Sequence, residues 1–145
     1  MVTRGQLIAF LKSHRLAVQS SVSPSGFPQS AVVGIAVNEA LEVVFDTLST
    51  TRKAENLRCN PYVSLVVGGL ALGDERTAQY EGIADFPSGE ELEQVRELYF
   101  SVWPDGRDRL SWPGLIHIRV RPKWIRYSDF NQTPPLIVEF VGGML

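Results

Sequence analysis

A chain of 145 residues with a formal net charge of −2 has the size of one domain with a single hydrophobic core. Apolar residues make up 44% and charged residues 21%, which excludes the compositions typical of disordered and fibrous proteins. The slight acidity excludes a generally basic surface of the kind that binds nucleic acid or anionic membranes. We therefore expect one domain over residues 1–145.

Cysteine and histidine are scarce. The single cysteine, Cys59, excludes an intrachain disulfide and a thiolate metal cluster, and two histidines make a transition-metal site improbable. The first residues lack the apolar core of a signal peptide, and no apolar run approaches the ~20 residues of a membrane span. These features favour a cytoplasmic protein without a metal site.

The first half of the chain predicts one helix followed by three strands. Thr3 is a suitable N-cap for a helix that extends to about His14, because its hydroxyl can accept from the first turn. Runs rich in β-branched residues, with partial alternation, predict strands at residues 15–23, 29–37 and 41–47. The segment PSGFP, residues 24–28, is a turn signal that makes the first two strands a hairpin.

The second half predicts two further helices and four further strands. A short helix begins after Thr51 and ends at Asn60, because the residue before a proline is pushed out of the helical region. A second helix over residues 88–102 has Ser88 and Glu91 at capping-box spacing. Strands are predicted at residues 62–69, 76–86, 115–122 and 123–130, a loop at 103–114, and a last edge segment or partner contact at 131–140. Gly82 marks a bulge or a close backbone approach.

Short strands that outnumber the helices and are separated by hairpin turns indicate a mainly β protein. The expected fold class is a mostly antiparallel β-barrel with peripheral helices.

Arg52 and Lys53 occupy the first turn of the short helix, where the helix dipole disfavours positive charge by ~0.3–1 kcal/mol per residue. A bound anion reverses that sign, because free N–H groups, hydroxyls and two cations then converge on it. Thr47 and Thr51 can donate further hydrogen bonds at the same place. This pattern predicts a phosphate site. The alternative is a hydroxyl-capped helix whose cations point into water.

A second group of basic residues alternates along the predicted strand at residues 115–122. His117, Arg119 and Arg121 share one face of it. They are interpreted either as a second anion-binding stripe or, preferably, as a solvated or dimer-facing polar face. The chain contains no nucleophile elbow of the Gly-x-Ser-x-Gly kind.

Several motifs in one order resemble a known family. Gly26, Phe27 and Pro28 are followed by an apolar strand, then by VVFDT and TTRKAENLRCNPYVSL, and later by YEGIA and by a final V-x-P-x-x-I-x-Y strand. This order resembles the pyridoxamine 5′-phosphate oxidase-like family of flavin-binding split barrels, and the likeness covers most of the chain.

The resemblance implies a homodimer of split β-barrels with FMN in clefts between the subunits. Arg52 and Lys53 would hold the FMN phosphate, assisted by Thr47 and Thr51. The residues expected beside the isoalloxazine ring are Ser30, Ala31, Val32 and Val33. Thr77 or Gln79 matches a position that often contacts the flavin, and Trp124 or Trp112 could close the cleft from the other subunit.

The chain departs from the vitamin B6 oxidases at two kinds of position. Ala31 and Ala36 stand where those enzymes carry an arginine and a lysine, and SDFNQTPPLIVEF lacks their C-terminal substrate motif. The sequence therefore predicts an FMN-dependent oxidoreductase that acts on an unknown small molecule and does not make pyridoxal phosphate. The alternative is a non-catalytic module that binds flavin, the deazaflavin F420 or heme for sensing or storage.

Overall fold

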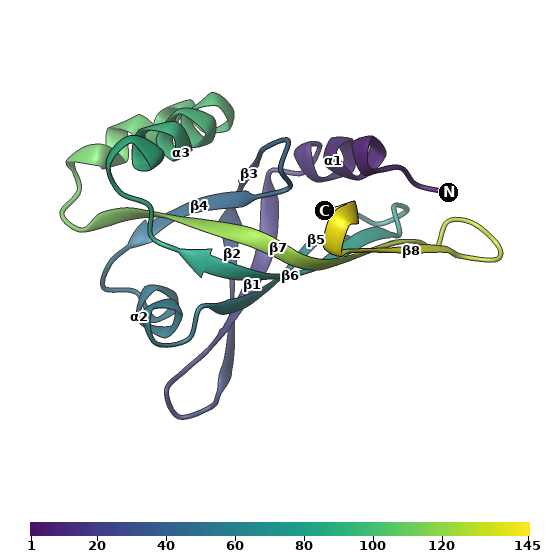
Figure 1. Ribbon diagram of the computed structural model, residues 1–145, viewed down its shortest axis with the longest axis horizontal. Helices are drawn as coiled ribbons and strands as arrows, with labels where there is room; N and C mark the ends of the chain where they lie inside the picture. Colours follow the sequence, from purple (N-terminus) through teal and green to yellow (C-terminus); the bar gives the residue numbers. More distant parts are fainter.

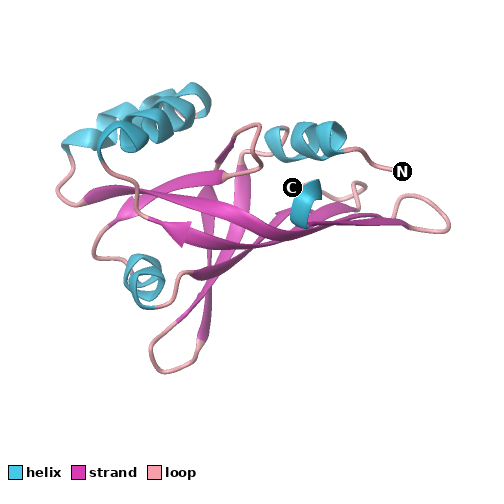
Figure 2. Cartoon of the chain, in the orientation of Figure 1, coloured by secondary structure: helices cyan, strands magenta, loops and turns pink.

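Eight strands and their flanking helices account for most of residues 1–145, all of which the computed structural model describes (Figures 1 and 2). The strands are β1 Leu16–Val22, β2 Pro28–Gly34, β3 Ala36–Val37, β4 Val43–Leu48, β5 Tyr62–Gly68, β6 Arg76–Asp85, β7 Leu115–Asp129 and β8 Leu136–Val141. The helices are α1 Arg4–Lys12, α2 Arg52–Cys59 and α3 Gly89–Val102, with short 3₁₀ segments η1 Pro104–Ser111 and η2 Gly142–Met144.

All strand pairs are antiparallel, in the order β2-β1-β5-β6-β7-β4-β3, with β8 added on β7. The sheet curls, and the helices lie outside it (Figure 1). The β1–β2 hairpin projects from the body of the sheet, and α2 lies beside it. The predicted mainly β architecture with peripheral helices is confirmed.

The predicted strands at residues 115–122 and 123–130 are wrong as two elements, because β7 runs without a break from Leu115 to Asp129. The register with β6 pairs Gly82 with Pro122 and Glu81 with Trp124, so Lys123 is an extra residue in β7. A proline has no N–H to give to a ladder, and a bulge accommodates it. The bulge predicted at Gly82 is confirmed.

Residues 29–37 form β2 and β3 rather than one strand, because the chain turns away at Ile35. The Ile35 N–H donates to the Arg15 carbonyl at 2.9 Å, and its carbonyl accepts from the Trp103 indole at 3.0 Å. Gly34 permits this contact, since a Cβ there would lie 2.8 Å from the Trp103 ring. The predicted loop at residues 103–114 contains η1, and the tail forms the edge strand β8.

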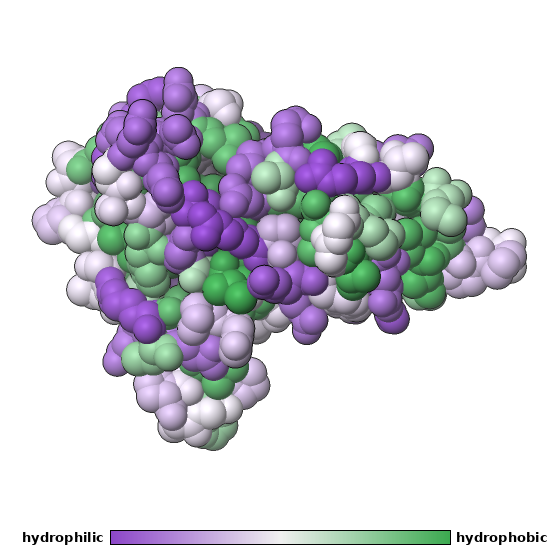
Figure 3. All heavy atoms as spheres, viewed as in Figure 1, coloured by the Kyte–Doolittle hydropathy of each residue, from purple (hydrophilic) through white to green (hydrophobic).

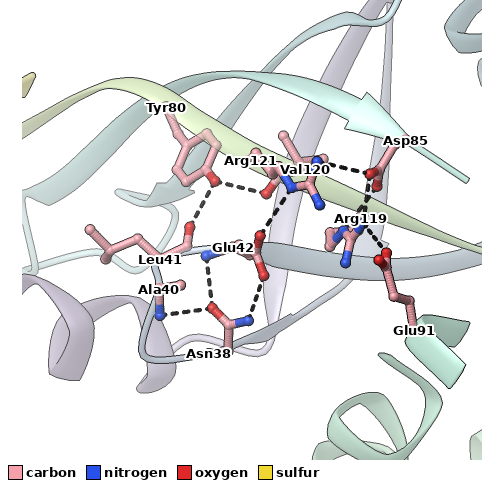
Figure 4. Close-up of polar contacts among 10 residues, drawn as sticks. All are labelled: Asn38, Ala40, Leu41, Glu42, Tyr80, Asp85, Glu91, Arg119, Val120 and Arg121. Carbon is pink, nitrogen blue, oxygen red and sulfur yellow. Dashed lines mark hydrogen bonds and ion pairs between the residues drawn. The ribbon is translucent and has the colours of Figure 1, made fainter. Parts of the chain in front are cut away.

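The core lies inside the curl of the sheet and is closed by α1. Alternate residues of β5 and β6 point inward, as the two-residue period of a strand requires. Tyr80 is fully buried there, and its hydroxyl donates to the carbonyls of Leu41 at 2.7 Å and Val120 at 3.1 Å (Figure 4). These two bonds tie β6 to the start of β4 and to β7.

The basic face of β7 is not a free anion stripe, and it is not solvated at His117 and Arg119, while Arg121 remains half exposed. Helix α3 covers this face at His117 and Arg119, which are 2% and 8% exposed. Arg119 donates to Asp85 at 3.0 and 2.7 Å and to Glu91 at 2.8 Å (Figure 4). Arg121 forms ion pairs with Glu42 and Asp85. Carboxylates within the chain compensate both arginines.

The predicted capping box of α3 is also wrong. Ser88 is the N-cap residue, but its side chain makes no capping hydrogen bond. Glu91 forms an ion pair with Arg119 on β7 instead. Without Glu91, the buried guanidinium of Arg119 would have one carboxylate fewer to compensate its charge. The capping box of α1 does form, between Thr3 and Gln6.

The end of the molecule formed by α1 and β8 has a hollow lined by both apolar and polar residues. Val2, Phe10 and Leu136 are among its lining residues. Figure 3 shows hydrophobic residues at the surface there, between more polar borders. None of the helices has the length and apolar character required to cross a bilayer.

Candidate anion and cofactor site

Helix α2 begins with a hydroxyl cap. The Thr51 Oγ1 accepts from the Ala54 N–H at 3.4 Å and donates to the Leu48 carbonyl at 2.9 Å. The Thr47 hydroxyl lies 3.0 Å from it and donates to it, because the Thr51 proton is already used. The two threonines thus fix the loop that leads from β4 into α2, directly behind the two cations.

Arg52 and Lys53 form no ion pair with any carboxylate of the chain. The Arg52 Nε donates instead to the neutral Gln29 Oε1 at 3.2 Å. Burial lowers the pKa of the Lys53 ammonium, and the Asp46 carboxylate partly opposes that shift. A desolvated ammonium and an arginine bound only to an amide favour a negatively charged ligand.

Both cations line a cavity of about 390 Å³ between α2 and the β1–β2 hairpin. Its lining residues are Gln19, Ser21, Pro28, Gln29, Ser30, Ala31, Arg52 and Lys53. They come from β1, β2 and the first turn of α2, so the N-terminus of the helix opens onto the cavity. No carboxylate lies among them, so Arg52 and Lys53 give the lining a positive formal charge.

Three amide side chains of this region were missed by sequence reasoning. Asn56 is 3% exposed and donates to the Gln29 Oε1 at 2.8 Å and to the Ser21 Oγ at 3.1 Å. Gln29 therefore accepts from both Asn56 and Arg52, which orients the guanidinium. Gln19 is the third amide. The alternation in β1 carries a signal for it, since Gln19 shares the inward side with Ala17.

The four residues predicted on β2 divide between its two sides. Ala31 points toward the cavity, and Val33 is buried further along the same side. Val32 is exposed on the outer side, where the Ser30 Oγ lies 2.7 Å from the Ser20 Oγ, and Ser30 also borders the cavity. The strand thus runs along the cavity, and its backbone rather than its side chains is the common element.

Thr77 and Gln79 do not lie at this cavity. They belong to β6, which β1 and β5 separate from β2 in the sheet order. Gln79 lines a different hollow, of about 200 Å³, together with Trp124, and the Trp124 indole donates to Glu139 at 3.2 Å. Trp112 is half exposed at the end of η1. One chain therefore does not bring these residues to Arg52 and Lys53.

A larger hollow of about 580 Å³ lies on the other side of the hairpin and shares Ser21 and Pro28 with the first. Its charged lining residues are Lys123, from the bulge in β7, and Glu81. One cation beside one carboxylate gives little net attraction for an anion. The smaller cavity beside α2 therefore remains the better candidate for an anionic ligand.

Comparison with known proteins finds a family that matches most of the chain. Residues 4–129 match the family described as pyridoxamine 5′-phosphate oxidase. A pyridoxine/pyridoxamine 5′-phosphate oxidase of Bordetella avium (strain 197N) is 29% identical in an alignment over 125 residues that covers 80% of this chain and 57% of that protein. The chain thus spans little more than half the length of this relative.

Two solved structures share the fold at low sequence identity. The heme binding protein from Mycobacterium smegmatis has a TM-score of 0.84 at 12% identity, over 99% of this chain and 60% of that one. A pyridoxamine 5′-phosphate oxidase-related, FMN binding protein from Nostoc punctiforme has a TM-score of 0.68 at 11% identity, over 95% and 84%. Since the curled sheet is that of a split barrel and the family match covers residues 4–129, the chain belongs to the pyridoxamine 5′-phosphate oxidase family.

Proposed function

We propose that this chain binds FMN beside α2 and acts as an oxidoreductase on a small molecule. The observation that carries the proposal is the pair Arg52 and Lys53, which faces a cavity and has no carboxylate partner. Two oxygens of a phosphate there would accept hydrogen bonds from the Arg52 guanidinium. The Lys53 ammonium would attract the phosphate as a compact positive charge. The phosphate would also meet the free N–H groups of the first turn of α2.

The rest of the cofactor would extend along β2, past Ser30, Ala31, Val32 and Val33. Backbone groups of this strand would then meet the polar edge of the isoalloxazine ring. Thr47 and Thr51 would support the loop between β4 and α2 that meets the phosphate, because their hydroxyls hold the start of α2. The match to an oxidase family and the FMN binding relative from Nostoc punctiforme support this reading.

A homodimer would complete the site. Thr77, Gln79 and Trp124 lie on the outer side of the sheet, so a second copy would have to bring them to the flavin. The outer side of β1, β2 and β5 exposes large apolar side chains, which favours burial in an interface. They are Leu16, Val32, Tyr62 and Val66.

A bound flavin would supply the hydride chemistry, while the chain would bind and orient it. The cavity offers no carboxylate or histidine as a general base. We do not propose pyridoxal phosphate as the product. Ala31 and Ala36 bring no charge, and the segment SDFNQTPPLIVEF, residues 128–140, contains neither an arginine nor a histidine. We also propose a cytoplasmic location, since Cys59 is exposed and free.

The second candidate is a binding module without turnover, for flavin, deazaflavin or heme. The name of the Mycobacterium smegmatis protein favours heme among these ligands. The residues of the cavity favour flavin, because neither histidine lines it. His14 bonds to the Phe10 carbonyl at 2.9 Å, and His117 is buried under α3.

Titration of the purified protein with FMN and, separately, with hemin tests the proposal. We expect saturable quenching of flavin fluorescence with one FMN per chain, and weaker binding of hemin. Reduction of bound FMN by NADH or NADPH, followed by reoxidation with a small acceptor, would separate an enzyme from a module. A protein that binds hemin but not FMN would contradict the proposal.

A further inference from the structure

Gln19 occupies the middle of β1, with its side chain on the inner side of the sheet. Its register partners are Ala31 on β2 and Leu65 on β5. The side chain is 1% exposed and lines the cavity that contains Arg52 and Lys53. Its Oε1 has no hydrogen-bond partner. It is thus a buried amide with an unused acceptor, in a cavity that two cations also line.

A buried amide oxygen without a partner is costly, and folded proteins rarely keep one. Its neighbours in the register, Ala31 and Leu65, are apolar, so a leucine at position 19 would suit the packing better. The other two amides are used within the chain, since Gln29 accepts from Asn56 and Arg52 and Asn56 also bonds to Ser21. Gln19 is therefore the amide left to meet a ligand.

The position of Gln19 determines which part of a ligand it meets. An anion bound by Arg52 and Lys53 sits at the α2 side of the cavity, and Gln19 lies on the β1 side. The atoms that follow the anion in the ligand then pass Gln19. A hydroxyl group suits an amide in both roles, because it donates to Oε1 and accepts from the amide nitrogen.

We propose that Gln19 is a specificity-determining residue that binds a hydroxyl of the chain attached to the phosphate. The ligand class is a phosphate ester of a polyhydroxy chain. This inference rests on the proposed function and deepens it, since FMN carries such a chain. A tetrapyrrole carboxylate has no hydroxyl to offer at neutral pH, so Gln19 discriminates against it.

The test compares Gln19→Leu with the matched control Gln94→Leu, which removes an exposed amide of α3. Each protein is titrated with FMN, and inorganic phosphate is measured as a competitor. We expect Gln19→Leu to weaken FMN binding about tenfold, the effect of one net hydrogen bond. The competition constant of inorganic phosphate should not change, and Gln94→Leu should match the wild type in both measurements.

Urea unfolding without ligand should show Gln19→Leu to be no less stable than the wild type. Gln19→Met, of similar length, replaces it if the leucine variant does not fold. Unchanged FMN affinity in a folded variant would overturn the inference and leave the proposed function standing. An equal loss for inorganic phosphate would place the amide on the anion and also overturn it. A wild type that binds phosphate but no FMN would defeat the proposed function itself.

Discussion

Cations at two places on the same sheet have opposite surroundings. Under α3, Arg119 lies between Asp85 and Glu91, and Arg109 bonds to Asp46 at 3.0 Å. Beside α2, Arg52 reaches only a neutral amide and Lys53 has no partner. Both places combine strands with one helix, but it is at the second place that the cations themselves line a cavity.

The pKa directions follow the same division. Hydrogen bonds to Asp85 raise the pKa of the Arg119 guanidinium, so the fold stabilises its charged form. Burial lowers the pKa of Lys53, so the fold disfavours its charged form. A positive charge that the chain compensates is structural. A positive charge that the chain leaves uncompensated, beside a cavity, is available to a ligand.

The double substitution Arg52→Ala and Lys53→Ala is the strongest test of this difference between the two groups of cations. FMN affinity should fall about 100-fold, because two charge-assisted contacts are lost. The free energy of unfolding should stay level or rise by about 0.3–1 kcal/mol per charge, since positive charge opposes the dipole at the start of α2. Flavin fluorescence titration and urea unfolding measure the two effects.

Arg58→Ala is the matched control at the other end of α2, where the guanidinium bonds to the Ser49 carbonyl. It should leave FMN affinity unchanged. If the double variant binds FMN within twofold of the wild type, the two cations do not hold the phosphate. A large loss of stability instead would make them structural, like Arg119.

Arg119→Met should have the reverse profile. We expect a loss of about 2 kcal/mol in the free energy of unfolding, because Asp85 and Glu91 lose their common partner. The loss is below that for a fully buried pair, since both carboxylates are partly exposed. Arg121→Met, at a half-exposed arginine, should cost less than about 1 kcal/mol in the same urea titration. FMN affinity should not change in either variant. A marked fall would mean that the face of β7 under α3 supports the cofactor directly.

The smallest expected effect concerns His117, whose two ring nitrogens have no partner. Burial lowers its pKa; Asp46 opposes that shift, while Arg96 and Arg109 add to it. The unfolded chain therefore binds this proton at a higher pH than the native chain. The stability that neutral His117 contributes is therefore fully present above the ordinary histidine pKa of about 6.5, and it is lost as the pH falls below that value.

Urea unfolding at pH 7.5, 6.5 and 5.5 measures this dependence. One proton contributes no more than about 1.4 kcal/mol per pH unit. His117→Leu should flatten the decline over this range. A decline of equal steepness in the variant would assign it to groups other than His117.

Local signals were sufficient for most of the fold. The turn at residues 24–28, the alternation in the strands and the Asn60-Pro61 stop predicted the elements around α2 correctly. Pro122 was misleading, because a proline within a strand suggests an end, and the bulge that tolerates it depends on Gly82 in another strand. The sequence of one strand, taken alone, does not reveal how that strand pairs with a distant one.

The candidate site was predictable where charge opposed local preference. Arg52 and Lys53 could be recognised because they are unfavourable at a helix start unless something binds them. Gln19, Gln29 and Asn56 could not be recognised as a group, since only the folding of β1, β2 and α2 onto one another brings them together. The same reason explains the error at Arg119, whose partner Glu91 belongs to a helix that covers the strand.

Two strands separate Gln79 on β6 from β2, which borders the cavity with Arg52, and this separation has a consequence for how the protein would work in a cell. Under the proposed assembly, a lone chain would supply only some of the residues that enclose one flavin. The fraction of chains that hold FMN would then depend on two concentrations, that of the chain and that of FMN. Newly made, dilute chains would stay colourless, and holoprotein would accumulate steeply as expression rises.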